Sequence, residues 1–236
     1  MKSQNIAFSD ISLQFCDAIG AGKSSITVAL FRLAKLNGGR ILLDGRDLSE
    51  LSLGDVRGRK NGMVIIPQDP VLWSGTVREC LDPWGTSRDE DILEALNAVN
   101  VGNVSDRGLS ALDEIVEEGG RNYSVGERQL LCLARAILSQ PKVLVLDEAT
   151  ASVDKDTDAF IQKMIRTRFQ GTTFLTIAHR LNTIMDYDKV VVLGKGRVLE
   201  CGSPKDLLQN ENGVFTDLVD STGKESSKIL REMALE

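Results

Sequence analysis

A run of apolar residues followed directly by two acidic residues constrains the fold of this chain more than any other feature. The run lies at Val143 to Leu146, and Asp147 and Glu148 follow it. A continuous apolar strand is typical of the centre of a parallel sheet that is covered on both faces. Ligand-binding and catalytic groups lie at the carboxyl ends of such strands. We therefore expect an α/β fold with a mostly parallel sheet, and with Asp147 and Glu148 at its functional edge.

The composition fits a single folded unit. The chain has 236 residues, of which 42% are hydrophobic and 26% are charged, so it can bury a core without help from disulfides or metals. Its formal net charge of −6 argues against nucleic acid as a partner. No apolar run approaches the roughly 18 residues of a spanning helix, and no secretory signal follows Lys2, so we expect synthesis in the cytosol and no membrane crossing by this chain. The cysteines are far apart and are expected to be free thiols: Cys16, Cys80, Cys132 and Cys201.

Strand-like and helix-like segments alternate along the chain, which predicts one compact α/β unit. Strands are expected around Ile11 to Phe15 and at 41–43, 63–66, 143–146 and 173–177, with a hairpin at Gly194 to Gly196. Helices are expected at 22–36, after a capping box at Ser87 and Glu90, after a second capping box at Ser124 and Glu127, and at 156–169. The segment from about Ser221 is expected to be loosely attached or helical.

A glycine-containing turn before the first expected helix is most of a phosphate-binding loop. In such a loop the backbone N–H groups surround a β-phosphate, Lys23 reaches the β and γ oxygens, and the hydroxyl of Ser24 ligates Mg²⁺. The full pattern needs glycine at a position where this chain has Asp17. Taken alone, the fragment fits an ordinary glycine-rich helix start equally well. Its residues are Gly20, Ala21, Gly22, Lys23, Ser24 and Ser25.

Two further features suit phosphate chemistry. Asp147 could hold Mg²⁺ through water, and Glu148 could polarise a water for in-line attack on a γ-phosphate; the simpler interpretation is a solvated acidic turn. The segment from Tyr123 to Gln129 begins a helix with Ser and Gly, which is typical of an anion site. From the residues alone, a plain capping box explains it as well.

From about Ile6 to Val219, the chain resembles an ATP-binding-cassette ATPase domain, and most closely the C-terminal nucleotide-binding domain of the multidrug-resistance-associated (subfamily C) transporters. The resemblance implies a P-loop NTPase fold of the ABC ATPase type, with a helical subdomain of about 69–138 inserted in a single domain, 1–220, and a tail at 221–236. Its motifs occur in the family's order: the Q-loop and following segment (67–78), the signature (123–129), the Walker B strand (143–148), the D-loop (151–154) and the switch-histidine strand (176–180).

The resemblance also implies roles for individual residues. His179, the only histidine, would contact the γ-phosphate and orient the attacking water. Gln68 would join the Mg²⁺ shell and couple the domain to transmembrane helices. Ser124 and Gly126 would contact ATP held by a second ABC ATPase domain, because these domains pair head to tail, and Asp154 is counted with the nucleotide-binding residues. The other partner would be the transmembrane domains of a transporter, at the cytosolic face of a membrane.

The sequence departs from the family in three places. Asp17 replaces the first glycine of the phosphate loop, and Glu127 replaces the usual signature Gln. About two strands are missing between Phe15 and Asp17, and two residues span only about 7 Å, so a strand that feeds the phosphate loop would place Phe15 in the sheet rather than over adenine. The alternative function is therefore a degenerate, non-hydrolysing cassette that acts as a regulatory or dimerisation module. A GTPase is disfavoured because the base-reading motif Asn-Lys-x-Asp is absent, and a small-molecule kinase would have no use for a signature helix.

Overall fold

The computed structural model describes residues 6–8, 13–17, 23–57, 62–147, 153–177 and 180–235. Side chains are described from Ser25 onwards, except at 102–106 and 155. The chain divides into two compact units: unit 1 comprises residues 1–56 and 173–236, and unit 2 comprises residues 57–172. Among the described residues, none of the helices combines the length and the apolar character that a bilayer span requires.

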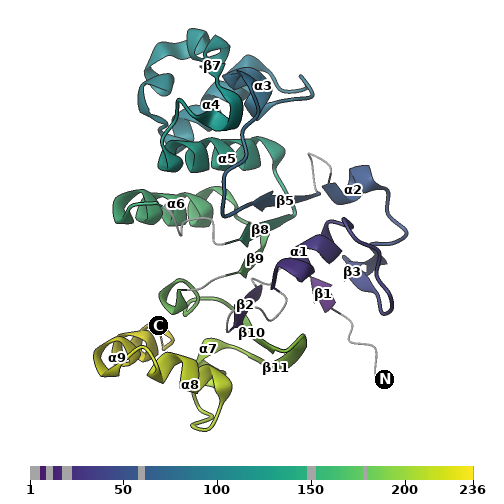
Figure 1. Ribbon diagram of the computed structural model, residues 1–236, viewed down its shortest axis with the longest axis vertical. Helices are drawn as coiled ribbons and strands as arrows, with labels where there is room; N and C mark the ends of the chain where they lie inside the picture. The colour runs from purple at the N-terminus through teal and green to yellow at the C-terminus, as the bar shows by residue number, and fades with distance from the viewer. Residues whose placement is uncertain are drawn as a thin grey trace. The chain divides into compact units, whose positions relative to one another are not determined.

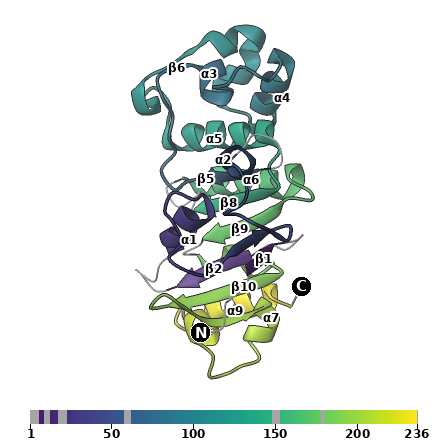
Figure 2. The same ribbon diagram turned by 90° about the vertical axis from the view of Figure 1, so that its right-hand side faces the viewer.

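The sheet of unit 1 is mostly parallel (Figure 2). Strand β2 (Leu13–Asp17) lies between β9 (Thr173–Ile177) and β10 (Lys189–Gly194) and runs parallel to both, while β11 (Arg197–Gly202) pairs with β10 in the antiparallel sense. A two-residue turn joins β10 to β11, with φ of 50° at Lys195 and 72° at Gly196, which is the left-handed pair that a tight hairpin requires. The predicted hairpin and the β9 strand are confirmed.

The N-terminal segment contains two separate strands where the resemblance predicted one. Strand β1 (Ile6–Phe8) pairs in parallel with β3 (Ile41–Leu43), and β3 pairs with β4 (Arg46–Asp47). Strand β2 belongs to the other sheet, where Phe15 is in register with Ile177 and Val191. Phe15 is therefore a sheet residue.

Helix α1 (Lys23–Leu30) is shorter than the predicted helix of 22–36. Arg32 adopts a left-handed φ of 50°, and the N–H groups of Arg32 and Leu33 bond back to the carbonyls of Ala29 (3.0 Å) and Val28 (2.9 Å). This pattern is a Schellman motif, which ends a helix. Leu33, which the predicted helix of 22–36 would have included, is consequently 67% exposed.

The C-terminal part of unit 1 is helical and attached, which decides between the two expectations for it. It contains α7 (Pro204–Leu207), α8 (Val214–Asp220) and α9 (Lys224–Met233). A short 3₁₀ turn, η3 (Leu181–Thr183), comes earlier in the unit, before β10. Phe215 and Leu230 pack into a buried cluster with Ile184 and Val190. The hydroxyl of Ser227 also donates to Asp220 at 2.7 Å, which fastens α9 to α8.

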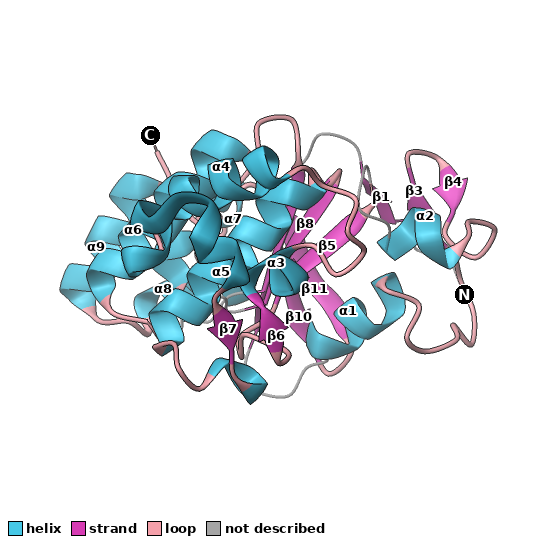
Figure 3. Cartoon of the chain, turned by 90° about the horizontal axis from the view of Figure 1, so that it is seen from above, coloured by secondary structure: helices cyan, strands magenta, loops and turns pink. Residues whose placement is uncertain are grey.

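Unit 2 combines a parallel strand pair with a group of helices (Figure 1). Strand β5 (Met63–Ile66) pairs with β8 (Val143–Asp147), both as predicted. The α-helices are α2, which begins just before the unit and ends in it (Leu53–Arg57), α3 (Val77–Leu81), α4 (Asp89–Val99), α5 (Val125–Ser139) and α6 (Lys155–Arg168). The connecting elements are η1 (Gly102–Asp113), η2 (Glu118–Gly120) and a short antiparallel pair, β6 (Gly75–Thr76) and β7 (Ile115–Val116), beside α3 (Figure 3).

The helix starts of unit 2 test the two predicted capping boxes. The box at Ser124 and Glu127 is confirmed. The box at Ser87 and Glu90 is wrong, because α4 begins one residue later, with Arg88 as its N-cap and no side-chain cap bond. The N–H of Ser87 is instead held by Asp82. The apolar positions of α4 nevertheless face the interior: Ile92, Leu96 and Val99 are buried and Leu93 is half-buried.

The cysteines agree with the predicted thiol state where the structure describes them. Cys80 and Cys132 are buried and Cys201 is exposed, and all three are free. Burial raises the pKa of the Cys80 and Cys132 thiols, so both are protonated, poorly reactive side chains. The side chain of Cys16 lies outside the described residues.

Candidate functional site

The start of helix α5 is a closed hydrogen-bonded ring. Ser124 is the N-cap, and its Oγ accepts from the backbone N–H of Glu127 at 3.2 Å. In return, Oε2 of Glu127 accepts from the N–H of Ser124 at 2.8 Å and from its hydroxyl at 2.7 Å. The carboxylate also lies at the positive end of the helix dipole. Ser124 is exposed at this helix end, so an incoming group would meet a helix N-terminus at which the Ser124 hydroxyl already donates to Glu127.

Gly126 and Asp154 adjoin the same neighbour, Thr157. A Cβ built on Gly126 would lie 3.5 Å from Cγ2 of Thr157. Asp154 is the N-cap of α6 and accepts from the N–H of Thr157 at 3.0 Å and from its hydroxyl at 2.7 Å. These hydrogen bonds, the backbone one foremost, lower the pKa of Asp154. The structure therefore brings together the signature and D-loop residues that the sequence predicted.

Asp147 is the last residue of β8, and Gln68 comes two residues after the end of β5. The register pairs Ile66 of β5 with Leu146 of β8, so the two strands reach the same edge of the sheet together and Asp147 and Gln68 lie at that edge. Gln68 is exposed and Asp147 is half-buried. Carboxylate and amide oxygens are hard donors of the kind that Mg²⁺ prefers, so the donor set at this edge fits that ion.

Gln129 is a residue at this edge that the sequence reasoning missed. Its side chain is 2% exposed, and its Nε2 donates to the carbonyl of Pro67 at 3.1 Å and to that of Gln68 at 2.9 Å. The partners are more than 60 residues apart in the chain. No local pattern signals such a contact.

Two arginines of α5 donate to carbonyls outside the helix. Arg128 donates to the carbonyl of Tyr123 at 2.7 Å. Arg135 donates from Nε to the carbonyl of Cys80 at 2.9 Å, and its guanidinium lies 4.4 Å from the centre of the Trp73 ring, a cation–π contact. Burial also raises the pKa of the Tyr123 phenol to about 12, so this ring is a neutral anchor in front of the helix.

The phosphate loop is described only in part. Asp17 ends β2 and Ile177 ends the parallel neighbour β9. Helix α1 begins at Lys23, and Ser25 is exposed in its first turn. The side chains of Lys23 and Ser24, and the residues Gly20, Ala21, Gly22, Glu148 and His179, lie outside what the structure describes.

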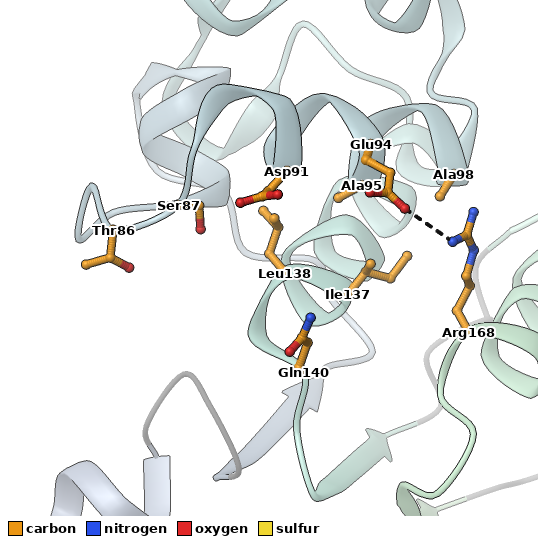
Figure 4. A pocket seen from close by; sticks show the side chains of 10 residues that line it. All are labelled: Thr86, Ser87, Asp91, Glu94, Ala95, Ala98, Ile137, Leu138, Gln140 and Arg168. Atoms are coloured by element: carbon orange, nitrogen blue, oxygen red, sulfur yellow. Dashed lines mark ion pairs between the residues drawn. The ribbon is translucent and has the colours of Figure 1, made fainter.

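Unit 2 also has a cavity that none of the predicted site residues lines. It has a volume of about 540 Å³ and lies among α4, the end of α5 and the end of α6 (Figure 4). An ion pair between Arg168 and Glu94, 3.7 Å apart, spans it. Its walls combine these charges with apolar side chains such as Ile137 and Leu138.

Three comparisons with known proteins agree. Residues 18–151 match the model of the family "ABC transporter". The chain is 50% identical over 215 residues to "ABC transporter C family member 3" of Dictyostelium discoideum, which covers 91% of this chain and 15% of that relative. It is 50% identical over 208 residues to "ATP-binding cassette sub-family C member 2" of Mus musculus, covering 88% of this chain and 13% of that relative.

A solved structure shows the same fold. It is described as "Structure of a bacterial Atm1-family ABC exporter with ATP bound", and the match has a TM-score of 0.81 and 33% sequence identity, over 92% of this chain and 38% of that one. The expected α/β, P-loop fold of the ABC ATPase type is confirmed. The chain thus spans a small part of its curated relatives and belongs to the ABC transporter family, as an ATP-binding domain similar to those of subfamily C members.

Proposed function

We propose that this chain binds MgATP and hydrolyses it, and that head-to-tail pairing with a second ABC ATPase domain drives substrate export through transmembrane domains at the cytosolic face of a membrane. The observation that carries the proposal is the register of β5 and β8, which brings Gln68 and Asp147 to one edge of the sheet. An Mg²⁺ ligand set and a water-activating residue are expected at such an edge.

Each site residue has a proposed role. The backbone and side chains of the phosphate loop, Gly20 to Ser25, hold the β- and γ-phosphates. Ser24 and Gln68 would supply oxygen ligands for Mg²⁺, and Asp147 would hold the ion through water; Mg²⁺ would contribute neutralisation of charge on the phosphate oxygens. Glu148 accepts a proton from the attacking water, and His179 and Gln68 orient that water.

The signature residues act on the partner domain's nucleotide in this proposal. Ser124 and Gly126 face ATP held by the second domain, with Asp154 close to them through Thr157. The exposed hydroxyl and helix N-terminus at Ser124 suit a phosphate group. We assign residues 1–220 to one ATPase domain with a helical subdomain of about 69–138, and residues 221–236 to a tail.

The test is Glu148→Gln in the full chain. The substitution keeps the size of the side chain and removes its basic carboxylate, so turnover should fall by about 10²- to 10⁴-fold. ATP affinity should stay unchanged, measured by equilibrium titration beside a steady-state phosphate-release assay. The matched control is Glu211→Gln, at an exposed position in unit 1.

Two results would contradict the proposal. Hydrolysis that is unchanged in Glu148→Gln would remove Glu148 from the chemistry. A wild-type chain that fails to bind MgATP at all would instead support the degenerate cassette that Asp17 raised as the alternative.

A further inference from the structure

One face of helix α5 grips the chain segment that carries Gln68. Gln129, Cys132 and Arg135 are spaced three residues apart along this helix. Gln129 bonds to the carbonyls of Pro67 and Gln68, the thiol of Cys132 contacts the backbone of Val71, and Arg135 bonds to the carbonyls of Val71 and Cys80. We call the segment from Pro67 to Cys80 the tethered segment. It is fastened to α5 at its start, middle and end.

The contact of Gln129 is the one nearest to the predicted ion ligand. Strand β5 ends at Ile66, so the next two carbonyls lie beyond the ladder with β8 and need other hydrogen-bond donors. The amide nitrogen of Gln129 serves both.

The chemistry of Gln129 shows that donation is what its amide contributes. Within the described part of the chain, Oε1 of Gln129 is buried and has no hydrogen-bond partner. Leaving a buried acceptor unpaired costs stability, and an apolar residue of similar shape would avoid that cost. The hydrogen bonds that the Nε2 group of Gln129 donates to the carbonyls of Pro67 and Gln68 offset this cost.

We propose that Gln129 is a positioning residue for Gln68. By fixing the carbonyls on both sides of the Cα of Gln68, it sets the direction in which the Gln68 side chain leaves the backbone, at the edge that also carries Asp147. Since Gln129 is five residues from the N-cap Ser124 on the same rigid helix, a displacement of the signature end of α5 moves Gln68 with it. The inference rests on the proposed function of Gln68 as an Mg²⁺ ligand.

The test compares Gln129→Met with Gln129→His in the full chain. Met matches the length of Gln and has no donor, whereas His keeps a ring N–H. Gln162→Met, on α6 at a half-buried position, is the matched control. The first readout is hydrogen exchange of the backbone amides of Gln68, Asp69 and Val71 without nucleotide. We expect exchange at least tenfold faster in Gln129→Met, near-wild-type exchange in Gln129→His, and no change in the control.

The second readout is the Mg²⁺ concentration that gives half-maximal ATP hydrolysis. It should rise about tenfold in Gln129→Met and be largely restored in Gln129→His, while the affinity for ATP without Mg²⁺ stays within twofold of the wild type. A variant that merely loosens the fold would also weaken the affinity for ATP without Mg²⁺.

Three outcomes separate the inference from the proposed function. Wild-type exchange of these amides in Gln129→Met would overturn the tether. Faster exchange with an unchanged Mg²⁺ dependence would overturn the positioning role. Absence of hydrolysis in the wild type would count against the proposed function and, with it, against a catalytic use of the tether. If Gln129→Met fails to fold, Gln129→His decides the question: a rise of about tenfold in its Mg²⁺ concentration for half-maximal hydrolysis, despite the retained N–H donor, would overturn the role.

Discussion

Helices α1 and α5 both begin at a segment that is expected to meet phosphate, yet their surroundings differ. Helix α5 has 15 residues, a complete capping box and side chains that donate to six carbonyls outside the helix. Helix α1 has 8 residues and ends at the left-handed Arg32. The contrast indicates that α5 is a fixed element of its unit, to which other parts are attached.

The two regions also differ in the surroundings of an acidic residue, Glu127 at the start of α5 and Asp17 before α1. Oε2 of Glu127 accepts two hydrogen bonds from Ser124 at the positive end of α5, where a negative charge is stabilising. Asp17 is the last residue of β2, in register with Leu193, and the chain continues from it into the phosphate loop. A negative charge therefore stabilises the helix start at Glu127, whereas at Asp17 we predict that it opposes the binding of a phosphate.

The largest effect is expected for Asp17→Gly. At about 4 Å and an effective dielectric constant near 20, two like charges repel by about 4 kcal/mol. Lys23, Mg²⁺ and salt offset part of this, so we expect ATP affinity to rise at least about tenfold, or ~1.4 kcal/mol. Nucleotide titration at fixed Mg²⁺ and salt measures it. Asp44→Gly is the control, because Asp44 has a φ of 50° that glycine adopts readily.

Two results of that titration would contradict the argument. Unchanged affinity would mean that the Asp17 carboxylate points away from the phosphates. If neither form binds ATP, the strands missing from the N-terminal segment are the dominant defect and the charge is secondary.

Gly120→Ala should loosen the anchoring of α5 without touching α1. Gly120 has a φ of 67°, and a Cβ there would lie 2.8 Å from Cδ of Arg128 and 2.8 Å from Cδ1 of Leu72. The left-handed backbone and the forced shift together should lower the free energy of unfolding by about 2–4 kcal/mol. Gly119→Ala is a close control, since it has a φ of 70° with no atom within 4 Å of the added Cβ, and should cost only about 1–2 kcal/mol.

Urea unfolding of both variants gives the comparison. Equal losses in the two would show that the packing of Gly120 against Arg128 does not anchor the helix.

Ser124→Ala should cost less, because it removes only the cap. Loss of the hydrogen bond that the N–H of Glu127 donates to Oγ of Ser124 should lower the free energy of unfolding by about 1 kcal/mol. Ser87→Ala should change it less than Ser124→Ala does, because Arg88 and not Ser87 is the N-cap of α4. Thermal unfolding of the pair measures the difference. A Ser87→Ala variant as destabilised as Ser124→Ala would mean that the two helix starts are equivalent in solution.

The parts of the fold that sequence predicted well are those where local pattern and tertiary packing agree. The strand at Met63 to Ile66 and the helix at Val125 to Ser139 were found because an apolar run and a capping box with an apolar stripe determine each of them. The box at Ser87 failed, although it has the same spacing. There Asp82 takes the Ser87 N–H and Arg88 pairs with Asp91 at 2.8 Å.

One local pattern was overlooked: the capping box of Thr76 and Glu79 is visible in their spacing.

Other features depend on contacts that no local pattern contains. The contact of Gln129 with Pro67, by contrast, joins residues 62 apart, and the left-handed Arg32 that ends α1 early has no Gly or Asn to signal it. The roles given to Lys23, Glu148 and His179 stay predictions.

The smallest effect on folding is expected for Gly126→Ala, and it isolates the function of the signature. The added Cβ would meet Thr157 at 3.5 Å, an ordinary contact, and Ala is a better helix former than Gly. The free energy of unfolding should therefore stay within about 0.5 kcal/mol of the wild type or rise slightly.

If a partner's nucleotide packs over Gly126, the methyl group of Gly126→Ala should still weaken ATP-dependent pairing, measured by sedimentation velocity in a Glu148→Gln background that retains ATP. Thr167→Ala, at an exposed position on α6, serves as the control for folding and pairing. Full pairing in Gly126→Ala would show that no partner packs closely against α5 at this residue, and the signature would then have to act through Ser124 alone.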